Sequence, residues 1–363
     1  MITHALIWLP LLVGQTHDDI SVLVYPATKE NPRYTEGSVI ELKNGSLLFA
    51  VTEFIGTGTD FSTGRIIGRE SKDGGKTWGP PRVLQKNTGK QNVMSVTLLR
   101  LSPDRIAMFY LEKNSHDDLH MFVRFSDDET KTFGNRVLVT AGEGYHIVNN
   151  DRIIRLKSGR LLVPVSYARD IKDRDRNHIT SHCVFSDDNG HTWKRGTGTV
   201  DLPKRGAMEP DCVQLLDGRI LMILRTQLGY VAKSYSSDDG NTWSKPESLG
   251  IKAPEAPATI RRIPATSDLV LIWNHTWKAG TDHGGKRTPL TSAISKDEGE
   301  TWQHIKNLEP DATKTFAYTS LTFIKDRAVM TYWETSPKRK GISSRFRSLP
   351  VSKLYQNRRM ACP

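Results

Sequence analysis

An eight-residue phrase that recurs along the chain constrains the fold more than any other feature. Its first copy, Ser71-Lys-Asp-Gly-Gly-Lys-Thr-Trp78, reads Ser-x-Asp-x-Gly-x-Thr-Trp. Good copies also start at Ser186, Ser236 and Ser295, and a degenerate copy starts at Ser126. The starts are separated by 55, 60, 50 and 59 residues (126−71, 186−126, 236−186 and 295−236). A near-constant period in this range predicts a repeat architecture.

Each copy of the phrase is expected to form a tight turn that leads into a strand. Gly, Asp and Asn at its centre suit a turn, because Gly tolerates a positive φ angle. The Ser and Asp side chains can hydrogen-bond the backbone of the turn, and the Trp indole can pack against the neighbouring repeat. The phrase is therefore predicted to be structural rather than catalytic.

A strand–turn–strand pattern precedes the phrases. It is clearest at residues 38–50, 152–163 and 212–223, and looser copies lie at 96–104, 259–264 and 321–327. Six units of four short strands predict an all-β, six-bladed β-propeller with antiparallel blades. We expect residues 17–350 to form this single domain, residues 1–16 to be a signal peptide or an N-terminal strand, and residues 351–363 to be a C-terminal tail.

Composition narrows the possible partners. The formal net charge of +11 at pH 7 suits an acidic polysaccharide, an anionic small substrate or a nucleic acid. The chain has no nucleic-acid-binding motif and no apolar run long enough to span a bilayer, so we expect neither nucleic acid nor membrane insertion. Its three cysteines give no even disulfide framework. We also predict a monomer with no metal and no organic cofactor.

The N-terminal residues bear on localisation. Residues 5–13 are apolar and are followed by Gly14, as in the core of a signal peptide, but no Lys or Arg precedes them. The pattern favours a secreted or periplasmic protein, and a cytoplasmic one if the segment is not a signal.

Polar residues recur where the predicted inner strands open the central channel of the propeller. Glu36 stands nine residues before Gly45 (45−36), and Glu209 stands nine before Gly218 (218−209). The same offset in the other repeats gives Ser95, Asn150 and Tyr318, and the irregular fifth repeat gives Ala256 or Pro257. A polar set that converges on one channel mouth predicts a binding site.

Three arginines are expected at the same mouth. Arg225 ends the second strand of the fourth repeat, Arg287 precedes a strand of the fifth, and Arg33 stands just before the first inner strand. A guanidinium group binds a carboxylate in bidentate fashion. Three of them would form a clamp for a carboxylate.

These residues together resemble the sialidase (neuraminidase) superfamily with bacterial neuraminidase repeats. The eight-residue phrases match the Asp-box of that family, and the resemblance covers roughly residues 25–333. It implies a retaining exo-sialidase-like glycoside hydrolase that removes terminal sialic acid, or a related nonulosonic or ulosonic acid, from a glycan. In such enzymes three arginines hold the substrate carboxylate, a Tyr–Glu pair supplies the nucleophile and its base, and an Asp is the acid/base.

The resemblance also implies roles for individual residues. Tyr318 matches the nucleophile, Glu209 its base and Asp60 the acid/base, with Asp117 or Asp118 as alternatives to Asp60. A neutral Tyr hydroxyl suits this substrate, because a carboxylate nucleophile would be repelled by the carboxylate on the anomeric carbon. The implied substrate-binding residues are Arg33, Arg225, Arg287, Glu36, Asn150 and Asp151.

Arg33 departs from the family pattern. The family places an Arg-Ile-Pro sequence with Arg directly before the ring position, whereas Arg33 stands three residues before Glu36. Glu36 also adds negative charge to a carboxylate pocket unless it pairs with Arg33. Two alternatives therefore stay open: a propeller glycoside hydrolase or lyase acting on another acidic glycan, and a non-catalytic glycan-binding propeller.

Overall fold

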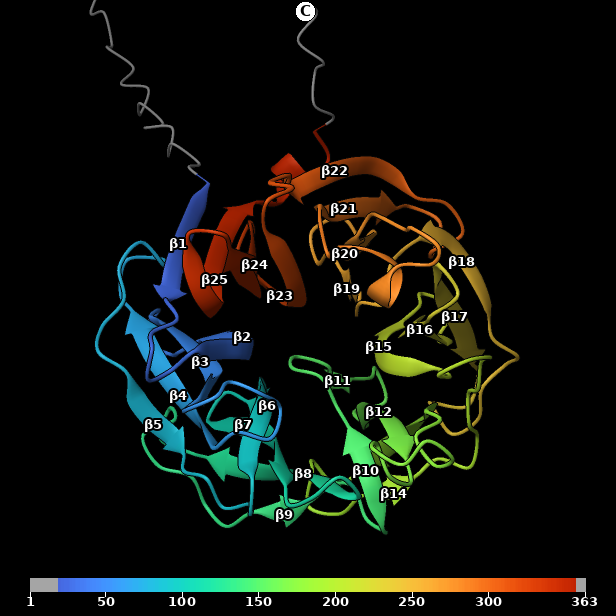
Figure 1. The fold of residues 1–363 in the computed structure, drawn as a ribbon. Coiled ribbons are helices and arrows are strands. Elements are labelled where there is room, and N and C mark those ends of the chain that lie inside the picture. The colour runs from blue at the N-terminus through green and yellow to red at the C-terminus, as the bar shows by residue number, and fades with distance from the viewer. Residues whose placement is uncertain (1–18, 357–363) are drawn as a thin grey trace, which may run out of the picture.

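The computed structural model describes residues 19–356, which contain 25 strands, two 3-10 helices and no α-helix. The strands form six blades arranged in a ring, as Figure 1 shows. The prediction of an all-β, six-bladed propeller is confirmed. In this part of the chain, neither helix has the length and apolar character that crossing a membrane requires.

The first three blades follow one another in chain order. The first contains β2 (Arg33–Glu41), β3 (Leu47–Phe54), β4 (Gly64–Ser71) and β5 (Arg82–Gln85). The second contains β6 (Asn92–Ser102), β7 (Arg105–Lys113), β8 (Asp118–Ser126) and β9 (Val137–Leu138). The inner strand of the third is split into β10 (Gly144–Ile147) and β11 (Ile154–Arg155), followed by β12 (Leu161–Ala168), β13 (Thr180–Ser186) and β14 (Lys194–Arg195).

The last three blades complete the ring. The fourth contains β15 (Met208–Gln214), β16 (Ile220–Arg225), β17 (Tyr230–Ser236) and β18 (Glu247–Lys252). The fifth contains β19 (Thr259–Arg262), β20 (Leu269–Asn274), β21 (Leu290–Ser295) and β22 (Gln303–Glu309), with η1 (Asp282–Gly284) between β20 and β21. The sixth contains β23 (Thr315–Ile324), β24 (Arg327–Ser336) and β25 (Arg339–Pro350), followed by η2 (Val351–Leu354).

The N-terminal strand closes the ring. β1 (Ile20–Tyr25) pairs antiparallel with β25 and is the outer strand of the sixth blade. The two ends of the described chain therefore meet in one blade (Figure 1). Val351 and Leu354, in the expected tail, are buried in the core of this region. The apolar residues 5–13 and residues 357–363 lie outside the described part of the chain.

The five eight-residue phrases form the turns between the third strand of a blade and its outer strand. In the first, Ser71 Oγ accepts a hydrogen bond from the Gly75 amide at 2.8 Å. The Asp73 carboxylate accepts bonds from the amide and hydroxyl of Thr77 at 2.9 and 2.6 Å. Equivalent bonds recur in the other four copies. These are the bonds expected of a structural turn.

The hydrophobic core lies between successive blades rather than within any one of them. Strands of the first and second blades share one buried cluster, which includes Leu48 and Met108, and strands of the fourth and fifth share another, which includes Leu221 and Leu271. Trp78 packs edge-on against Phe346 of the sixth blade, with ring centroids 5.0 Å apart. Because apolar packing holds the blades side to side, the ends of the inner strands are free to carry polar groups.

Candidate active site

Four inner strands carry the same backbone irregularity at one mouth of the channel. Glu36, Ser95 and Tyr318 each have a φ of 57°, and Glu209 has a φ of 43°. At all four the register of the antiparallel pairing shifts, which marks a β-bulge. A left-handed φ is uncommon for residues other than Gly, and bulges re-aim side chains next to functional sites. Here all four side chains line one pocket.

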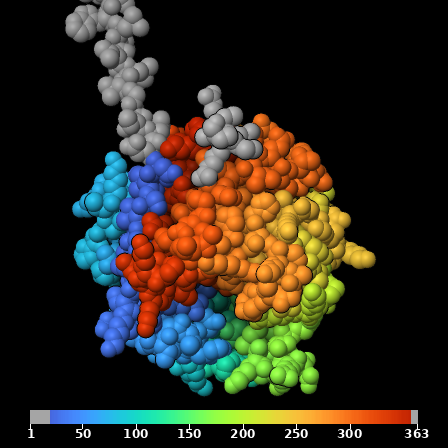
Figure 2. Space-filling model, turned by 45° about the horizontal axis from the view of Figure 1, so that its top comes forward, coloured from blue at the N-terminus to red at the C-terminus, as the bar shows by residue number. Residues whose placement is uncertain are grey.

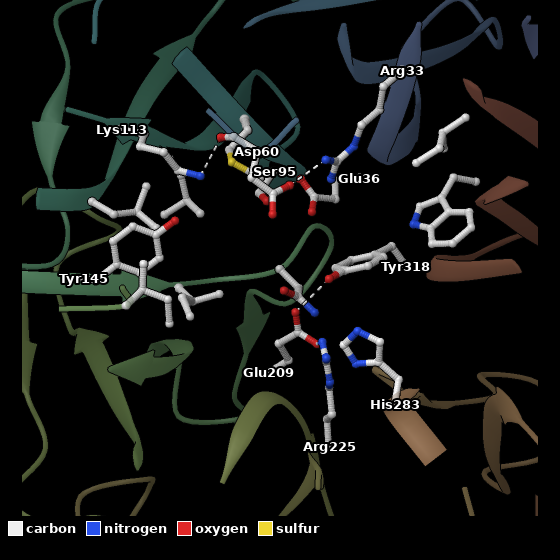
Figure 3. A pocket seen from close by; sticks show the side chains of 18 of the residues that line it. Arg33, Glu36, Asp60, Ser95, Lys113, Tyr145, Glu209, Arg225, His283 and Tyr318 are labelled. Carbon is white, nitrogen blue, oxygen red and sulfur yellow. Dashed lines mark hydrogen bonds and ion pairs between the residues drawn. The ribbon is translucent and has the colours of Figure 1, made fainter. Parts of the chain in front are cut away.

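Tyr318 and Glu209 point toward each other across this pocket, although they are 109 residues apart in the chain (Figure 3). The Tyr318 hydroxyl donates to Glu209 Oε1 at 2.8 Å, and Arg225 Nη1 donates to Glu209 Oε2 at 2.6 Å. Burial and the Glu209 carboxylate raise the pKa of Tyr318, against Arg225 and Arg287. Burial favours the protonated form of Glu209, but Arg225, with Arg287 and the Tyr318 hydroxyl, outweighs burial and holds the pKa of Glu209 below its usual range. The pair is therefore a neutral phenol beside an ionised carboxylate that can take its proton.

Glu255 holds the cationic side of the pocket together. Its buried carboxylate accepts bonds from Arg225, Arg205 and Gln227, each at 3.0 Å, and lies 3.1 Å from His283 Nδ1. Burial alone would raise the pKa of Glu255, but Arg225 and the other donors lower it to about 2. The backbone carbonyl of Glu255 also accepts a bond from Arg287 Nη2 at 3.1 Å. One loop residue thus orients both Arg225 and Arg287.

Asp60 lies on the opposite side of the pocket, in the loop between β3 and β4 (Figure 3). Its carboxylate forms an ion pair with Arg33 Nη1 at 2.5 Å. Its backbone carbonyl accepts bonds from Lys113 Nζ at 2.8 Å and from Asn92 Nδ2 at 2.9 Å. Burial opposes ionisation of Asp60, but Arg33 and Lys113 lower its pKa overall. The second blade therefore fixes the loop that carries Asp60.

The pocket has a volume of about 430 Å³, and both charged and apolar side chains line it. Figure 2 shows the surface hollowed near the centre of the ring, between the red and orange blades and the green one. Its lining has five Lys or Arg residues against three Asp or Glu residues, namely Arg33, Lys113, Arg205, Arg225 and Arg287 against Glu36, Asp60 and Glu209. An apolar wall formed by Met94, Leu111, Leu119, Ile147 and Ile171 lies in the same cavity. This volume and lining suit a small anionic ligand with an apolar substituent.

Seven of the nine site residues that the resemblance implies meet in this pocket. Arg33, Glu36, Asp60, Glu209, Arg225, Arg287 and Tyr318 all line the pocket, and so does Ser95 from the ring positions. Arg33 stacks over the Phe54 ring at 4.7 Å and still reaches the pocket despite its displaced position in the sequence. The alternatives Asp117 and Asp118 do not line it.

Asn150 and Asp151 are the exception, because the structure does not bring their side chains into the pocket. Asn150 Nδ2 donates to the backbone carbonyls of Gly37 and Tyr318. The Asp151 carboxylate accepts a bond from the Leu321 amide at 2.9 Å and lies 3.5 Å from Arg261 Nη2. Both side chains therefore tie blades together at the ring centre and lie outside the lining of this pocket. Their neighbour Asn149 lines the pocket.

Several residues in or beside the pocket were missed by the reasoning from sequence. Lys113 is the last residue of β7, as Arg225 is the last residue of β16, so the rule that identified Arg225 would also have found it. Glu255 and His283 lie in irregular segments of the fifth blade, where the repeat has no regular offset. Trp333 lies opposite Ala317 on β24 and stacks on Tyr318, with centroids 6.3 Å apart.

Comparisons with known proteins show the family of the chain. A family model described as BNR repeat-like domain matches residues 69–330, which is most of the chain. The chain belongs to the sialidase/BNR-repeat superfamily. A sialidase of Clostridium perfringens is 24% identical over 255 residues, covering 61% of this chain and 63% of the relative. The chain spans about half the length of the curated relatives it matches (43–63%).

Solved structures show the same superfamily fold. A protein of unknown function from Dyadobacter fermentans superposes with a TM-score of 0.74 at 19% identity, covering 91% of this chain and 98% of that one. Trypanosoma rangeli sialidase superposes with a TM-score of 0.71 at 16% identity, covering 93% of this chain and 60% of that one. At these identities the likeness is one of fold.

Proposed function

We propose that this protein is a retaining exo-sialidase-like glycoside hydrolase that removes a terminal sialic acid or a related nonulosonic or ulosonic acid from a glycan. The observation that carries the proposal is the 2.8 Å bond from the Tyr318 hydroxyl to Glu209, inside a pocket with Arg33, Arg225 and Arg287. A site that only bound a glycan would not need a buried phenol paired with an ionised carboxylate. The superfamily membership supports the same reaction class.

In the first step, Tyr318 Oη attacks the anomeric carbon while Glu209 takes the phenolic proton. The bond to the leaving oxygen breaks, and Asp60 supplies the proton to that oxygen. Water then attacks the anomeric carbon with Asp60 as base, the bond from that carbon to the tyrosine oxygen breaks, and the tyrosine oxygen recovers its proton from Glu209. Two displacements at one carbon give overall retention of configuration.

Asp60 has to be protonated to act as the acid, and substrate binding supplies a reason. The Arg33 guanidinium, 2.5 Å from the Asp60 carboxylate, favours its ionised form. A substrate carboxylate that binds Arg33 would compete for that guanidinium and add negative charge beside Asp60. Both effects raise the pKa of Asp60. The same carboxylate would also reach Arg225 and Arg287, whose orientation Glu255 fixes.

A second candidate keeps the pocket but changes the sugar. Glu36 favours it, because a carboxyl group inside the clamp is an addition to the family pattern. Another acidic sugar that presents a hydroxyl to Glu36 would use the same Tyr–Glu pair on a different glycan. The apolar wall beside Lys113 instead favours a sugar with an acyl substituent, as in N-acylated sialic acids.

Hydrolysis of a fluorogenic α-sialoside tests the proposal. We expect turnover by the wild type and its near-complete loss in Tyr318→Phe. Tyr332→Phe is the matched control, because Tyr332 is buried in the same blade and bonds Glu309 away from the pocket. No turnover by folded wild-type protein, or equal turnover by Tyr318→Phe, would contradict the proposal. Release of a uronic acid instead would support the second candidate.

A further inference from the structure

Glu36 is a buried carboxyl group in a pocket that is otherwise arranged for an anion. Glu36 is 4% exposed, and the bulge of β2 directs its side chain into the pocket (Figure 3). Glu36 Oε2 accepts a hydrogen bond from Ser95 Oγ at 2.9 Å. Among the described residues, Oε1 has no hydrogen-bond partner and is not sealed from the cavity. One oxygen is therefore available to a ligand.

No cation forms an ion pair with Glu36 among the described residues. Arg33, the arginine that lowers the pKa of Glu36, forms its ion pair with Asp60, and none of the ion pairs within residues 19–356 includes Glu36. Four other titratable groups interact electrostatically with Glu36, each from a different segment of the chain. They are Asp60, Lys113, Tyr145 and Tyr318. Burial, and to a lesser degree Asp60, outweigh Arg33, Ser95 and Lys113 and raise the pKa of Glu36 to about 7.

A bound carboxylate would make ionised Glu36 still less favourable. The ligand's negative charge would lie among the same arginines, within the cavity that Glu36 lines, and like charges in a shared buried site cannot both be ionised cheaply. A protonated Glu36, in contrast, has an O–H to donate and no net charge. The two protonation states therefore differ in their affinity for an anion.

We propose that Glu36 is a specificity-determining residue that binds the acidic ligand only in its protonated form, donating its hydroxyl hydrogen to a ligand oxygen. Ligand binding is then linked to uptake of one proton at this residue. The inference rests on the proposed function in one respect, namely that the ligand is a carboxylate-bearing sugar. It goes beyond that function because neither the Tyr–Glu pair nor the arginines require it.

The size of the linkage follows from the fraction of protein in the binding-competent form. With a pKa of about 7, roughly nine-tenths of the free protein is protonated at Glu36 at pH 6, and about one-tenth at pH 8. The dissociation constant of an anionic ligand should rise about tenfold between these pH values. Binding at pH 8 should take up about 0.9 proton.

Calorimetric titration of the full chain with the inhibitor DANA, which is bound in a structure of Trypanosoma rangeli sialidase, measures both quantities. Titrations at pH 6, 7 and 8 in buffers of different ionisation enthalpy give the affinity and the proton uptake. Glu36→Gln mimics the protonated carboxyl group, so we expect its affinity to be nearly independent of pH in this range, with no linked proton. Lys113→Arg is the control for Lys113, whose pKa burial lowers to about 8, and His283→Gln is the control for the histidine that lines the pocket. Both variants should keep the tenfold dependence.

The outcomes separate this inference from the proposed function. If DANA binds and the wild type and Glu36→Gln show the same pH dependence, the inference fails and the proposed function stands. If DANA binds neither protein at any pH, the proposed function fails and the inference fails with it. A carboxyl band in the infrared spectrum at pH 6 that disappears in Glu36→Gln would support the protonated state directly, and its absence from the wild type would contradict it.

Discussion

Replacing Glu209 with Gln tests whether Tyr318 depends on a neighbouring base. An unperturbed tyrosine hydroxyl, with a pKa of about 10, is ionised in roughly one molecule in 10³ at pH 7. Burial raises the pKa of Tyr318 further, so the fraction is smaller still. Glu209, 2.8 Å away, is the one side chain hydrogen-bonded to this hydroxyl among the described residues. The nucleophile therefore needs Glu209 to accept its proton during attack.

The expected loss in kcat is about 10²–10⁴-fold, the usual contribution of a general base. This corresponds to about 3–5 kcal/mol of transition-state stabilisation. Binding should behave differently, because Glu209→Gln removes a negative charge from a pocket for an anion. Arg225 also retains Glu255 at 3.0 Å. We expect the affinity for DANA to stay within about tenfold of the wild type or to increase.

Steady-state kinetics on a fluorogenic α-sialoside and calorimetry with DANA measure the two effects. Glu334→Gln is the matched control, because Glu334 is a buried carboxylate bonded to Arg345 outside the pocket. The double variant with Tyr318→Phe should be no slower than the slower single variant, since the two groups act as a unit. A Glu209→Gln enzyme that keeps more than a tenth of its kcat, or losses that multiply in the double variant, would refute the reasoning.

Three further predictions concern residues around the pocket and the ring centre. Lys113→Met removes the bond to the Asp60 carbonyl, so it should lower kcat about tenfold while changing KM much less. An unchanged kcat would contradict the positioning role of Lys113. Asp151→Ala should lower the free energy of unfolding by about 1–3 kcal/mol in urea titrations, because the Leu321 amide loses its acceptor while Arg261 keeps Asp211 at 2.7 Å. His182 is buried with no hydrogen-bond partner, and burial lowers its pKa to about 3. Its unfolded form takes up a proton below pH 6.5 while the folded form does not, so stability should fall by about 2 kcal/mol from pH 7 to pH 5, and His182→Phe should remove this fall.

Much of the fold could be predicted from the sequence because the eight-residue phrase recurs at near-constant spacing and with the same types of side chain. The turn bonds of Ser71 and Asp73 are local, so each phrase specifies its own hairpin wherever it occurs. The ring closure could not be predicted in the same way. β1 has no phrase of its own, and its pairing with β25 joins residues more than 300 positions apart.

The candidate site, like the fold, could be predicted from the sequence only in part. Counting nine residues back from the hairpin located Glu36, Ser95, Glu209 and Tyr318, because all four lie on one recurring bulge. The count failed in the third blade, where the inner strand is split and the left-handed residue is Asp151, one position later than Asn150. Asp151 is held at the ring centre by Leu321 and Arg261, which are long-range contacts with no local signal.

Glu255 illustrates what lies beyond sequence patterns. It orients Arg225, Arg205 and Arg287 from an irregular loop of the fifth blade, where no offset from a hairpin applies. The three arginines are scattered along the sequence, and Glu255 is the residue that holds them in one binding site. A sequence reveals the arginines, but only the fold reveals the carboxylate that holds them in place.

The most direct test of the central claim is to trap the covalent intermediate on Tyr318. 2,3-Difluorosialic acid is bound as a covalent intermediate in a structure of Trypanosoma rangeli sialidase. We expect incubation of this protein with that reagent to add one sugar mass to the intact chain. Peptide mass spectrometry should place it on Tyr318, and Tyr318→Phe should remain unlabelled. Labelling of another residue, or no labelling of protein that hydrolyses α-sialosides, would contradict the assignment of Tyr318 as the nucleophile.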